Sequence, residues 1–250
     1  GVWWERIVDR PQRFGDRKAN FHGAYSGLWW QLPTLKLEEQ QEIWLVEGIF
    51  DAIALHHHGI AAVSLMTCNN YPAQALSQLA ALFVDKKRPL LVWALDNDKA
   101  GMNSPRRWVK RSRDDGWLST AAQTPYSRTK LDWNDLHQRD RLNPDLIKKY
   151  RYYGSLLIAP NPNAKALLMH ERTERKEFHF EFDSRLYWFK LDIDRYMRAF
   201  DNVMYNGKEE LDEEEAKHKA LQESAAVVEI ANCYPTALYY QANTITDESW

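Results

Sequence analysis

Two short apolar runs that end in carboxylates constrain the fold of this chain most strongly. The run IWLV (43–46) leads directly into Glu47. The run LLVWAL (90–95) leads into Asp96 and Asp98. Short apolar runs bounded by turn residues are typical of strands that a parallel sheet buries on both faces. Because ligands bind where parallel strands end, we expect the three acids to meet there if the two strands are neighbours.

Strand and helix patterns alternate through the region that contains these runs. Apolar residues at helical spacing follow the first run, and they both precede and follow the second. This alternation predicts an α/β fold with a mostly parallel sheet flanked by helices. The expected elements are a strand at 43–48, a helix at 50–58, a strand at 61–65, a helix at 72–87, a strand at 89–98 and a basic helix at 100–117.

Changes in composition divide the chain into three parts. Its 250 residues correspond to one large domain or two small ones, and 44% apolar and 27% charged residues are ordinary globular usage. We expect a basic segment at 1–41, the α/β domain at 42–154 and a smaller α+β accessory or linker domain at 155–250. The last part holds a turn-rich break at 160–164, a hairpin pattern at 178–193 and an acidic helix at 208–226.

Several protein classes are excluded by simple counts. Cys68 and Cys233 can form neither a disulfide framework nor a zinc ribbon, so we expect no zinc in this chain. No apolar run approaches the roughly 18 residues of a membrane span, and the start lacks a signal-peptide pattern. The sequence predicts a cytoplasmic protein with no membrane partner. Its start without Met and its end in mid-pattern suggest a piece of a longer protein.

The three carboxylates predict a divalent cation site. Asp96 and Asp98 point to the same side of an extended backbone, and Glu47 would join them from the neighbouring strand. Without compensation, such acids raise one another's pKa values. Mg²⁺ prefers clusters of oxygen ligands and relieves the repulsion. Asp51 either begins the following helix or supports the metal ligands from behind.

The segments VEGIFD (46–51) and LDNDKAG (95–101) resemble the Toprim domain, which bacterial-type primases, topoisomerases and some nucleases share. The resemblance covers about 100 residues. It implies that Glu47, Asp96 and Asp98 are catalytic and hold Mg²⁺, which Mn²⁺ can replace, for phosphoryl transfer. Whether one or two metal ions bind stays open. A topoisomerase would need a tyrosine nucleophile in a further large domain, for which 250 residues leave no room.

Two flanking segments resemble primases more specifically. FGDRKANFHGAYSGLWWQL (14–32) resembles the basic segment that precedes Toprim in bacterial-type primases. KLDWNDLHQR (130–139) resembles the element that closes Toprim in primases and primase–helicases, although Leu131 interrupts it. In the closing element, Lys130 and Asp135 can equally be a solvated loop charge and a helix cap. The residues that the resemblance assigns to nucleotides or DNA are Arg17, Lys18, Asn20, His22, Lys99 and Lys130.

Basic residues cluster after the second carboxylate run. Residues 86–113 contain nine Lys and Arg against two Asp, whereas the whole chain has a net charge of -2. This balance suits the phosphate backbone of single-stranded DNA, but a solvated helix face explains it equally well. The Trp and Tyr residues near the N-terminus can stack on bases or pack in the core. We interpret His56–His58 as a solvated helix end.

These patterns predict the catalytic fragment of a DNA primase. It would join NTPs into RNA primers on a single-stranded DNA template, beside a helicase in the same parent chain or in a separate protein of a phage or mobile element. A metal-dependent Toprim nuclease and a non-catalytic DNA-binding module attached to a helicase are the alternatives. The primase's zinc-binding module would have to lie elsewhere.

Overall fold

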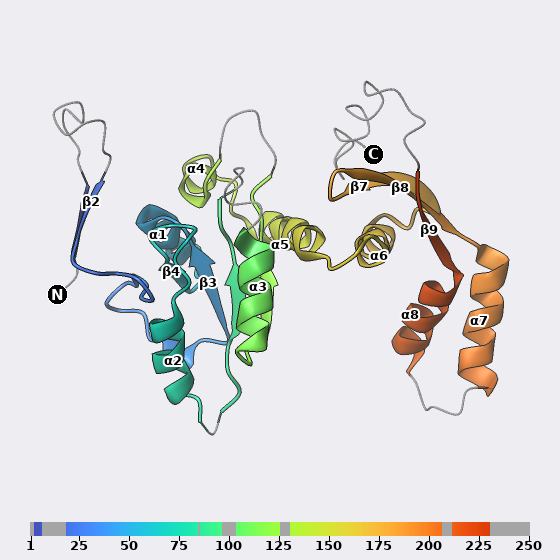
Figure 1. Ribbon diagram of the computed structural model, residues 1–250, viewed down its shortest axis with the longest axis horizontal. Coiled ribbons are helices and arrows are strands. Elements are labelled where there is room, and N and C mark those ends of the chain that lie inside the picture. Colours follow the sequence, from blue (N-terminus) through green and yellow to red (C-terminus); the bar gives the residue numbers. More distant parts are fainter. Residues whose placement is uncertain are drawn as a thin grey trace. The chain divides into compact units, whose positions relative to one another are not determined.

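A computed structural model describes residues 3–6, 19–84, 86–96, 104–125, 131–206 and 212–230. The chain forms two compact units, residues 1–158 and 159–250 (Figure 1). The division follows helix α5 (Pro144–Ile158), because this helix packs on the first unit along its whole length. It therefore falls four residues after the predicted boundary at 154, and the domain assignment itself stays a prediction.

The first unit is built on a four-stranded parallel sheet with the order β4-β3-β5-β6. Strand β3 pairs with β4 on one side and with β5 on the other, so that Leu45 lies opposite both Val63 and Trp93. The two strands that lead into Glu47 and Asp96 are therefore neighbours, as expected. The strands are β3 (Glu42–Val46), β4 (Ala62–Ser64), β5 (Leu90–Trp93) and β6 (Ser119–Ala121).

Helices cover both faces of this sheet, which explains why β3 and β5 are mostly apolar on both sides. On one face, Leu45 and Trp93 pack with residues of α2 (Ala73–Ala81) and α3 (Ser104–Asp114). On the other face, Trp44 and Val92 pack with α1 (Ile49–His57), α4 (Trp133–Gln138) and α5. The predicted α/β fold with a mostly parallel sheet is confirmed.

Some boundaries differ from those expected. Strand β5 ends at Trp93, because its ladder with β6 ends where Trp93 faces Ala121. The next carbonyl, that of Ala94, accepts a hydrogen bond from Trp133 Nε1 at 2.8 Å instead. Helix α2 ends at Ala81, after which Leu82 and Phe83 form a turn. Strand β6 and helices α4 and α5 were not predicted.

The N-terminal segment contributes a hairpin of β1 (Trp3–Arg6) and β2 (Ala19–His22). Asn20 Nδ2 donates to Glu5 Oε1 at 2.9 Å, and His22 Nε2 lies 3.2 Å from the same oxygen. The chain then passes a 3-10 helix, η2 (Leu37–Glu39). Before it, the backbone of Trp30 bonds to Ser64 in both directions at 2.8 Å, beside the outer edge of β4.

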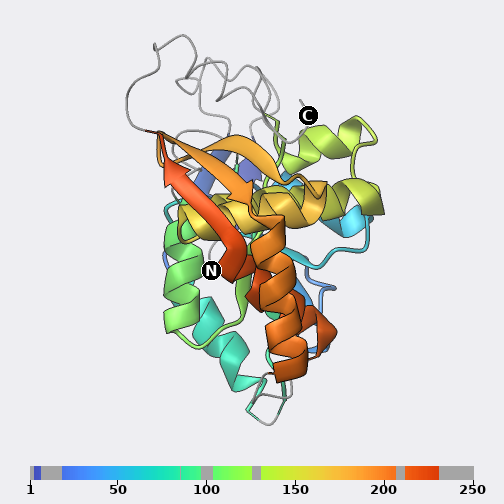
Figure 2. The ribbon, with the colours of Figure 1, turned by 90° about the vertical axis from the view of Figure 1, so that its right-hand side faces the viewer.

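The second unit is an α+β arrangement around an antiparallel sheet, β7-β8-β9. The predicted hairpin is present, and Asp183 and Ser184 form its turn with positive φ angles of 48° and 61°. Helices α7 and α8 pack side by side (Figure 2). The elements are α6 (Pro162–Thr173), β7 (Glu177–Phe182), β8 (Arg185–Leu191), α7 (Ile193–Asn206), α8 (Glu213–Ser224) and β9 (Ala225–Glu229). Among the described residues, no helix is long and apolar enough to span a membrane.

Candidate metal centre

Glu47 and Asp96 follow neighbouring strands at the carboxyl edge of the parallel sheet. Glu47 comes directly after β3 and is half-buried, whereas Asp96 comes three residues after β5 and is only 7% exposed. Asp98 and Lys99 lie in the segment 97–103, outside the described residues. The structure therefore describes two of the three predicted metal ligands, and it puts them on adjacent strands.

The side chain of Ser64, at the end of the neighbouring strand β4, fixes the backbone of Glu47. Ser64 Oγ donates to the Glu47 carbonyl oxygen at 2.9 Å and accepts from the backbone N–H of Met66 at 3.1 Å. Gly48 follows, and a Cβ atom there would lie 2.6 Å from Asp51 Oδ2. A side chain at position 48 would thus displace the Asp51 carboxyl group, which explains the Glu-Gly pair at the strand end.

Asp51 lies behind this edge, at the start of α1. It is 5% exposed, and its carboxyl group accepts hydrogen bonds from the backbone of Gly48 at 3.1 Å and of Asn134 at 3.0 Å. Burial raises the pKa of Asp51 to about 8, and the charges of Asp132 and Asp96 add to the increase. At neutral pH, Asp51 is therefore mostly protonated, and it links α1 to the first turn of α4.

Asp132 is the acid that sequence reasoning missed. It caps α4, where its Oδ1 accepts from the backbone of Asp135 at 2.7 Å, and its charge acts on Asp51. Asp135 Oδ2 accepts from the backbone of Asp132 at 3.3 Å, so Asp135 is occupied in the capping box. The signal was an Asp three residues before another acid, which is typical of a helix start. Lys130 lies outside the described residues.

The described donors are of the type that a hard divalent cation binds. Glu47 and Asp96 offer carboxylate oxygens, which Mg²⁺ prefers, just after two adjacent strands. Within the described ranges, no group of three or more His, Cys, Asp or Glu has metal-binding geometry. The predicted site includes Asp98, so the described residues make up part of it.

The predicted nucleotide-binding residues do not gather at this edge in the part of the chain that the structure describes. Asn20 and His22 bond to Glu5 within the N-terminal hairpin. Arg17 and Lys18 lie outside the described residues, as do Lys99 and Lys130.

Helix α3 divides its cations between structural and exposed positions. Arg106 Nε donates to the Leu157 carbonyl at 2.5 Å, and Arg113 donates twice to the Ser119 carbonyl, at 3.1 and 2.7 Å. The exposed Arg107 and Arg111 instead place their guanidinium groups over the rings of Trp108 and Tyr71. Only part of the basic stretch is thus available to a ligand.

The histidines at the end of α1 contact α4, which their sequence pattern did not predict. His58 Nε2 lies 3.0 Å from His137 Nδ1, and the His57 ring stacks on that of His137 at 5.4 Å. Burial and the two neighbouring histidines lower the pKa of His58. These rings join the far ends of the helices that Asp51 and Asn134 join at their starts.

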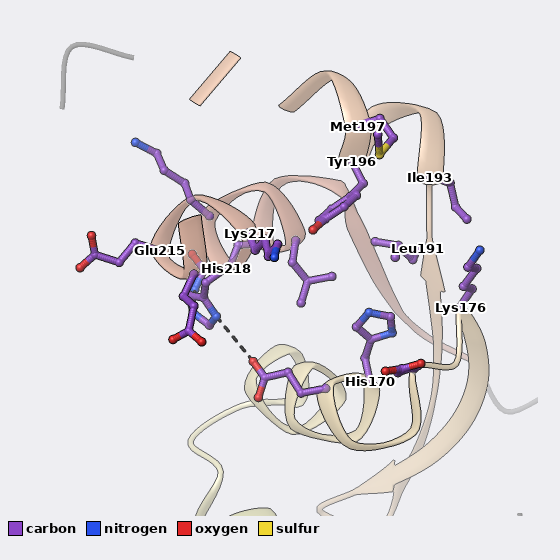
Figure 3. Close-up of a pocket in the computed structure, with 15 residues that line it drawn as sticks. His170, Lys176, Leu191, Ile193, Tyr196, Met197, Glu215, Lys217 and His218 are labelled. Carbon is purple, nitrogen blue, oxygen red and sulfur yellow. Dashed lines mark hydrogen bonds and ion pairs between the residues drawn. The ribbon is translucent and has the colours of Figure 1, made fainter. Parts of the chain in front are cut away.

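A cavity of about 1120 Å³ lies wholly within the second unit (Figure 3). Leu191, Tyr196 and Met197 form its apolar wall, and His218 Nδ1 lies 3.6 Å from Glu171 Oε1 at its rim. None of the predicted site residues lines it. All the predicted site residues lie within the first unit, residues 1–158.

Comparison with known proteins agrees with the geometry of the first unit. The sequence profile of a family described as Toprim-like matches residues 44–137. Residues 44–137 are a Toprim domain. The matched Toprim range begins within β3, ends within α4, and contains Glu47, Asp51, Asp96 and Asp132. A search of the curated proteins gives no match.

Two solved structures are similar to the chain at low identity. One is the RNA polymerase domain of Mycobacterium tuberculosis primase DnaG, with 16% identity and a TM-score of 0.44, covering 69% of this chain and 59% of that chain. The other is the same domain in complex with double-stranded DNA, with 16% identity, a TM-score of 0.39 and coverage of 68% and 58%. This chain thus spans about three fifths of their length.

Proposed function

We propose that the chain is the catalytic fragment of a DNA primase that synthesises RNA primers on single-stranded DNA. The observation that carries the proposal is the pair Glu47 and Asp96, which end adjacent parallel strands of a Toprim domain. The buried Asp51 and the capping Asp132 support this pair from α1 and α4. Such an edge suits metal-dependent phosphoryl transfer.

The reaction would join two nucleotides. The 3′-hydroxyl oxygen of one nucleotide attacks the α-phosphorus of the next, the bond to the β-phosphate breaks, and pyrophosphate leaves while the hydroxyl proton passes to solvent. Mg²⁺, or Mn²⁺ in its place, would be held by Glu47, Asp96 and Asp98 and would stabilise the negative charge on the phosphates. The predicted contacts of the chain with template and nucleotide phosphates are Arg17, Lys18, Asn20, His22, Lys99 and Lys130.

The chain's own residues would keep the acidic edge in place. Asp51 is mostly protonated, so it adds little negative charge while it fixes the starts of α1 and α4. The Ser64 hydroxyl holds the Glu47 carbonyl. Both contacts restrict the backbone that carries the predicted ligands, which is the positioning that phosphoryl transfer requires.

The remaining parts of the proposal concern the setting of this domain. The template is single-stranded DNA and the substrates are NTPs, in a cytoplasmic protein of a phage or mobile element. A helicase would act with it, in the same parent chain or as a separate protein. Residues 155–250 would serve as an accessory domain that joins the primase core to the rest of the parent protein.

Primer synthesis with labelled NTPs on single-stranded DNA tests the proposal. We expect wild-type protein with Mg²⁺ to yield short RNA, and the double variant Asp96→Ala and Asp98→Ala to yield none. Asp145→Ala, at an exposed position of α5, is the matched control and should keep full activity. Full activity of the double variant would overturn the assignment.

The same preparation separates the alternatives. Cleavage of DNA with Mg²⁺ or Mn²⁺ in the absence of NTPs would favour a nuclease, in which water replaces the 3′-hydroxyl as nucleophile. Absence of Mg²⁺ binding in calorimetry, with unchanged DNA affinity when Glu47, Asp96 and Asp98 are all replaced, would favour a non-catalytic binding module.

A further inference from the structure

A second site lies in the first unit, in a groove between the loop after β2, the loop after β4 and helix α3. We call it the Tyr71–Arg111 groove. Its volume is about 680 Å³, which is in the range of small-ligand pockets and large enough for one nucleotide unit. No acidic side chain is among the described residues that line it, and Arg111 gives it a positive charge. Its lining includes Tyr25, Gly27, Thr67, Asn69, Tyr71 and Arg111.

The walls of the groove are fixed by one buried side chain. Asn70 is 7% exposed, and its Oδ1 accepts from the backbone of Gly27 at 2.9 Å. Its Nδ2 donates to the carbonyls of Leu28 at 2.7 Å and Leu65 at 3.0 Å. The loop after β2 is thereby fastened to the loop after β4, so the fold itself forms the groove.

The Arg111 guanidinium lies over an aromatic stack. Its guanidinium carbon lies 3.9 Å from the centre of the Tyr71 ring, and that ring stacks on Trp93 at 5.7 Å with 11° between the planes. The Tyr71 hydroxyl donates to Asp115 Oδ2 at 2.6 Å, which keeps the ring in place. In the described ranges, the Arg111 guanidinium has no hydrogen bond or ion pair, so its N–H donors are available.

This arrangement suits a ligand that combines an anion with a flat ring. A guanidinium that is already oriented by stacking can bind a phosphate through two N–H groups, and its exposed face can stack on a base. Thr67 and Asn69 add hydroxyl and amide groups that can bind sugar or base edges. A bare metal ion would find no carboxylate among the lining residues.

One wall of the groove is connected to the carboxylate edge through the chain. Thr67 and Asn69 belong to the loop that leaves β4, whose last residue, Ser64, bonds to the Glu47 carbonyl.

We propose that the Tyr71–Arg111 groove binds one nucleotide unit through the Arg111 guanidinium, supplied by a single-stranded DNA or by a free nucleotide. The inference rests on the proposed function, because it assigns a binding site to the substrates of that reaction. It assigns this role to a residue outside the predicted metal site and outside the basic N-terminal segment.

Fluorescence anisotropy with a labelled oligo-dT of about 20 nucleotides, in EDTA at fixed low salt, tests this site without the metal. We expect Arg111→Ala to weaken oligonucleotide binding about tenfold, because it removes a charged donor to a phosphate. Arg111→Lys keeps the charge but loses the planar fork, and it should bind with intermediate affinity. Arg88→Ala is the matched control, since Arg88 also stacks on a ring, that of Trp117 at 5.0 Å, but lies outside the groove.

A parallel titration with ATP distinguishes the two sources. Weaker binding of oligo-dT alone assigns the groove to the DNA strand, and weaker binding of ATP alone assigns it to a free nucleotide. Wild-type affinity of Arg111→Ala for both probes, an equal loss in Arg88→Ala, or no binding of either probe to wild type would overturn the inference. A failure of the proposed function can be told apart from a failure of this inference. The proposed function fails if the double variant Asp96→Ala and Asp98→Ala retains primer synthesis, an assay that requires Mg²⁺. The anisotropy assay is carried out in EDTA and does not depend on the metal.

Discussion

Each unit contains a capping box at the start of a helix, but one box lies beside a buried acid and the other lies in solvent. In the first unit, Asp132 and Asp135 form a capping box at the start of α4, and in the second, Asp212 and Glu215 form one at the start of α8. The hydrogen bonds are alike, with the capping oxygens at 2.7 and 2.8 Å from the backbone nitrogens. Asp132, however, acts on the buried Asp51, whereas the box of α8 is exposed to solvent.

The different types of sheet in the two units explain why the acids of the first unit are more buried than those of the second. A parallel sheet buried on both faces directs its strand ends into one crevice, so acids that follow the strands are partly removed from water. In the second unit, the alternation of exposed and buried residues along β7 shows that one face of the antiparallel sheet meets solvent. Its acidic residues sit in the first turn of α8, where the helix dipole favours them. We therefore expect the carboxylates at the strand ends of the first unit to bind a metal ion, whereas those at the start of α8 stabilise a helix.

The largest expected contrast between the units concerns catalysis. Glu47→Gln removes the charge of a predicted metal ligand, so we expect primer synthesis to fall by about 100-fold or more. Glu214→Gln, an equivalent change in the exposed first turn of α8, should leave the rate unchanged. Initial rates on single-stranded DNA at saturating Mg²⁺ measure both. Equal rates for the two variants would show that primer synthesis depends no more on Glu47 than on an exposed acid of the second unit.

The two capping residues give a closer comparison. Asp132→Ala and Asp212→Ala should each lower the free energy of unfolding by about 1 kcal/mol, as the loss of a helix cap does. Only Asp132→Ala should also weaken Mg²⁺ binding, by about tenfold, because it disturbs the support of the predicted ligands. Denaturant unfolding and calorimetry measure the two effects. Loss of Mg²⁺ affinity in Asp212→Ala would show that the units are coupled.

The pH dependence of the free energy of unfolding should reveal the raised pKa of Asp51. Its pKa is about 8 in the folded protein and 3.8 when unperturbed, so between these values the folded state binds more protons than the unfolded state. Its contribution to stability is therefore complete below about pH 4 and is lost as pH rises through about 8. Asp51→Asn should remove this decline. An unchanged pH profile of thermal unfolding in the variant would assign the decline to another group.

The smallest effect is expected from removing the second unit. A chain that ends at Ile158 keeps all of α5, including the Leu157 carbonyl that Arg106 contacts. We expect it to bind Mg²⁺ within about twofold of the full chain, since the predicted ligands all lie in the first unit. A chain that ends at residue 154 would lack that contact and should be less stable. Unfolding of the longer chain would show that the two units share one core.

The sequence predicted the elements whose signals are local. The apolar runs identified β3 and β5, and their carboxylates followed from the general rule for parallel strands. The alternation of apolar and polar residues over 178–193 predicted the hairpin of β7 and β8. Strand β6 was missed, since its three residues, Ser119 to Ala121, carry no apolar run. Its burial comes from packing with α3 and α5.

A residue of the candidate site could be predicted only where the same short segment contains both the functional side chain and the pattern that fixes its place in the fold. Glu47 and Asp96 could be found because each directly ends an apolar run. The proximity of Asp132 to Asp51 depends on how α4 packs on α1, which no local pattern contains. The same holds for Arg111, whose stacking on Tyr71 joins residues 40 apart in the sequence.

Both outer strands of the parallel sheet are closed to further strand addition. At β4, the backbone of Trp30 already bonds to Ser64 in both directions. At β6, the backbone of Gly154 approaches the Ala121 carbonyl so closely that a Cβ atom would overlap it, and the backbone N–H of Gln123 donates to the Tyr150 carbonyl at 2.9 Å. An exposed sheet edge invites self-association and β-augmentation by peptides. We therefore expect these contacts to hinder edge-to-edge association of two copies of this sheet.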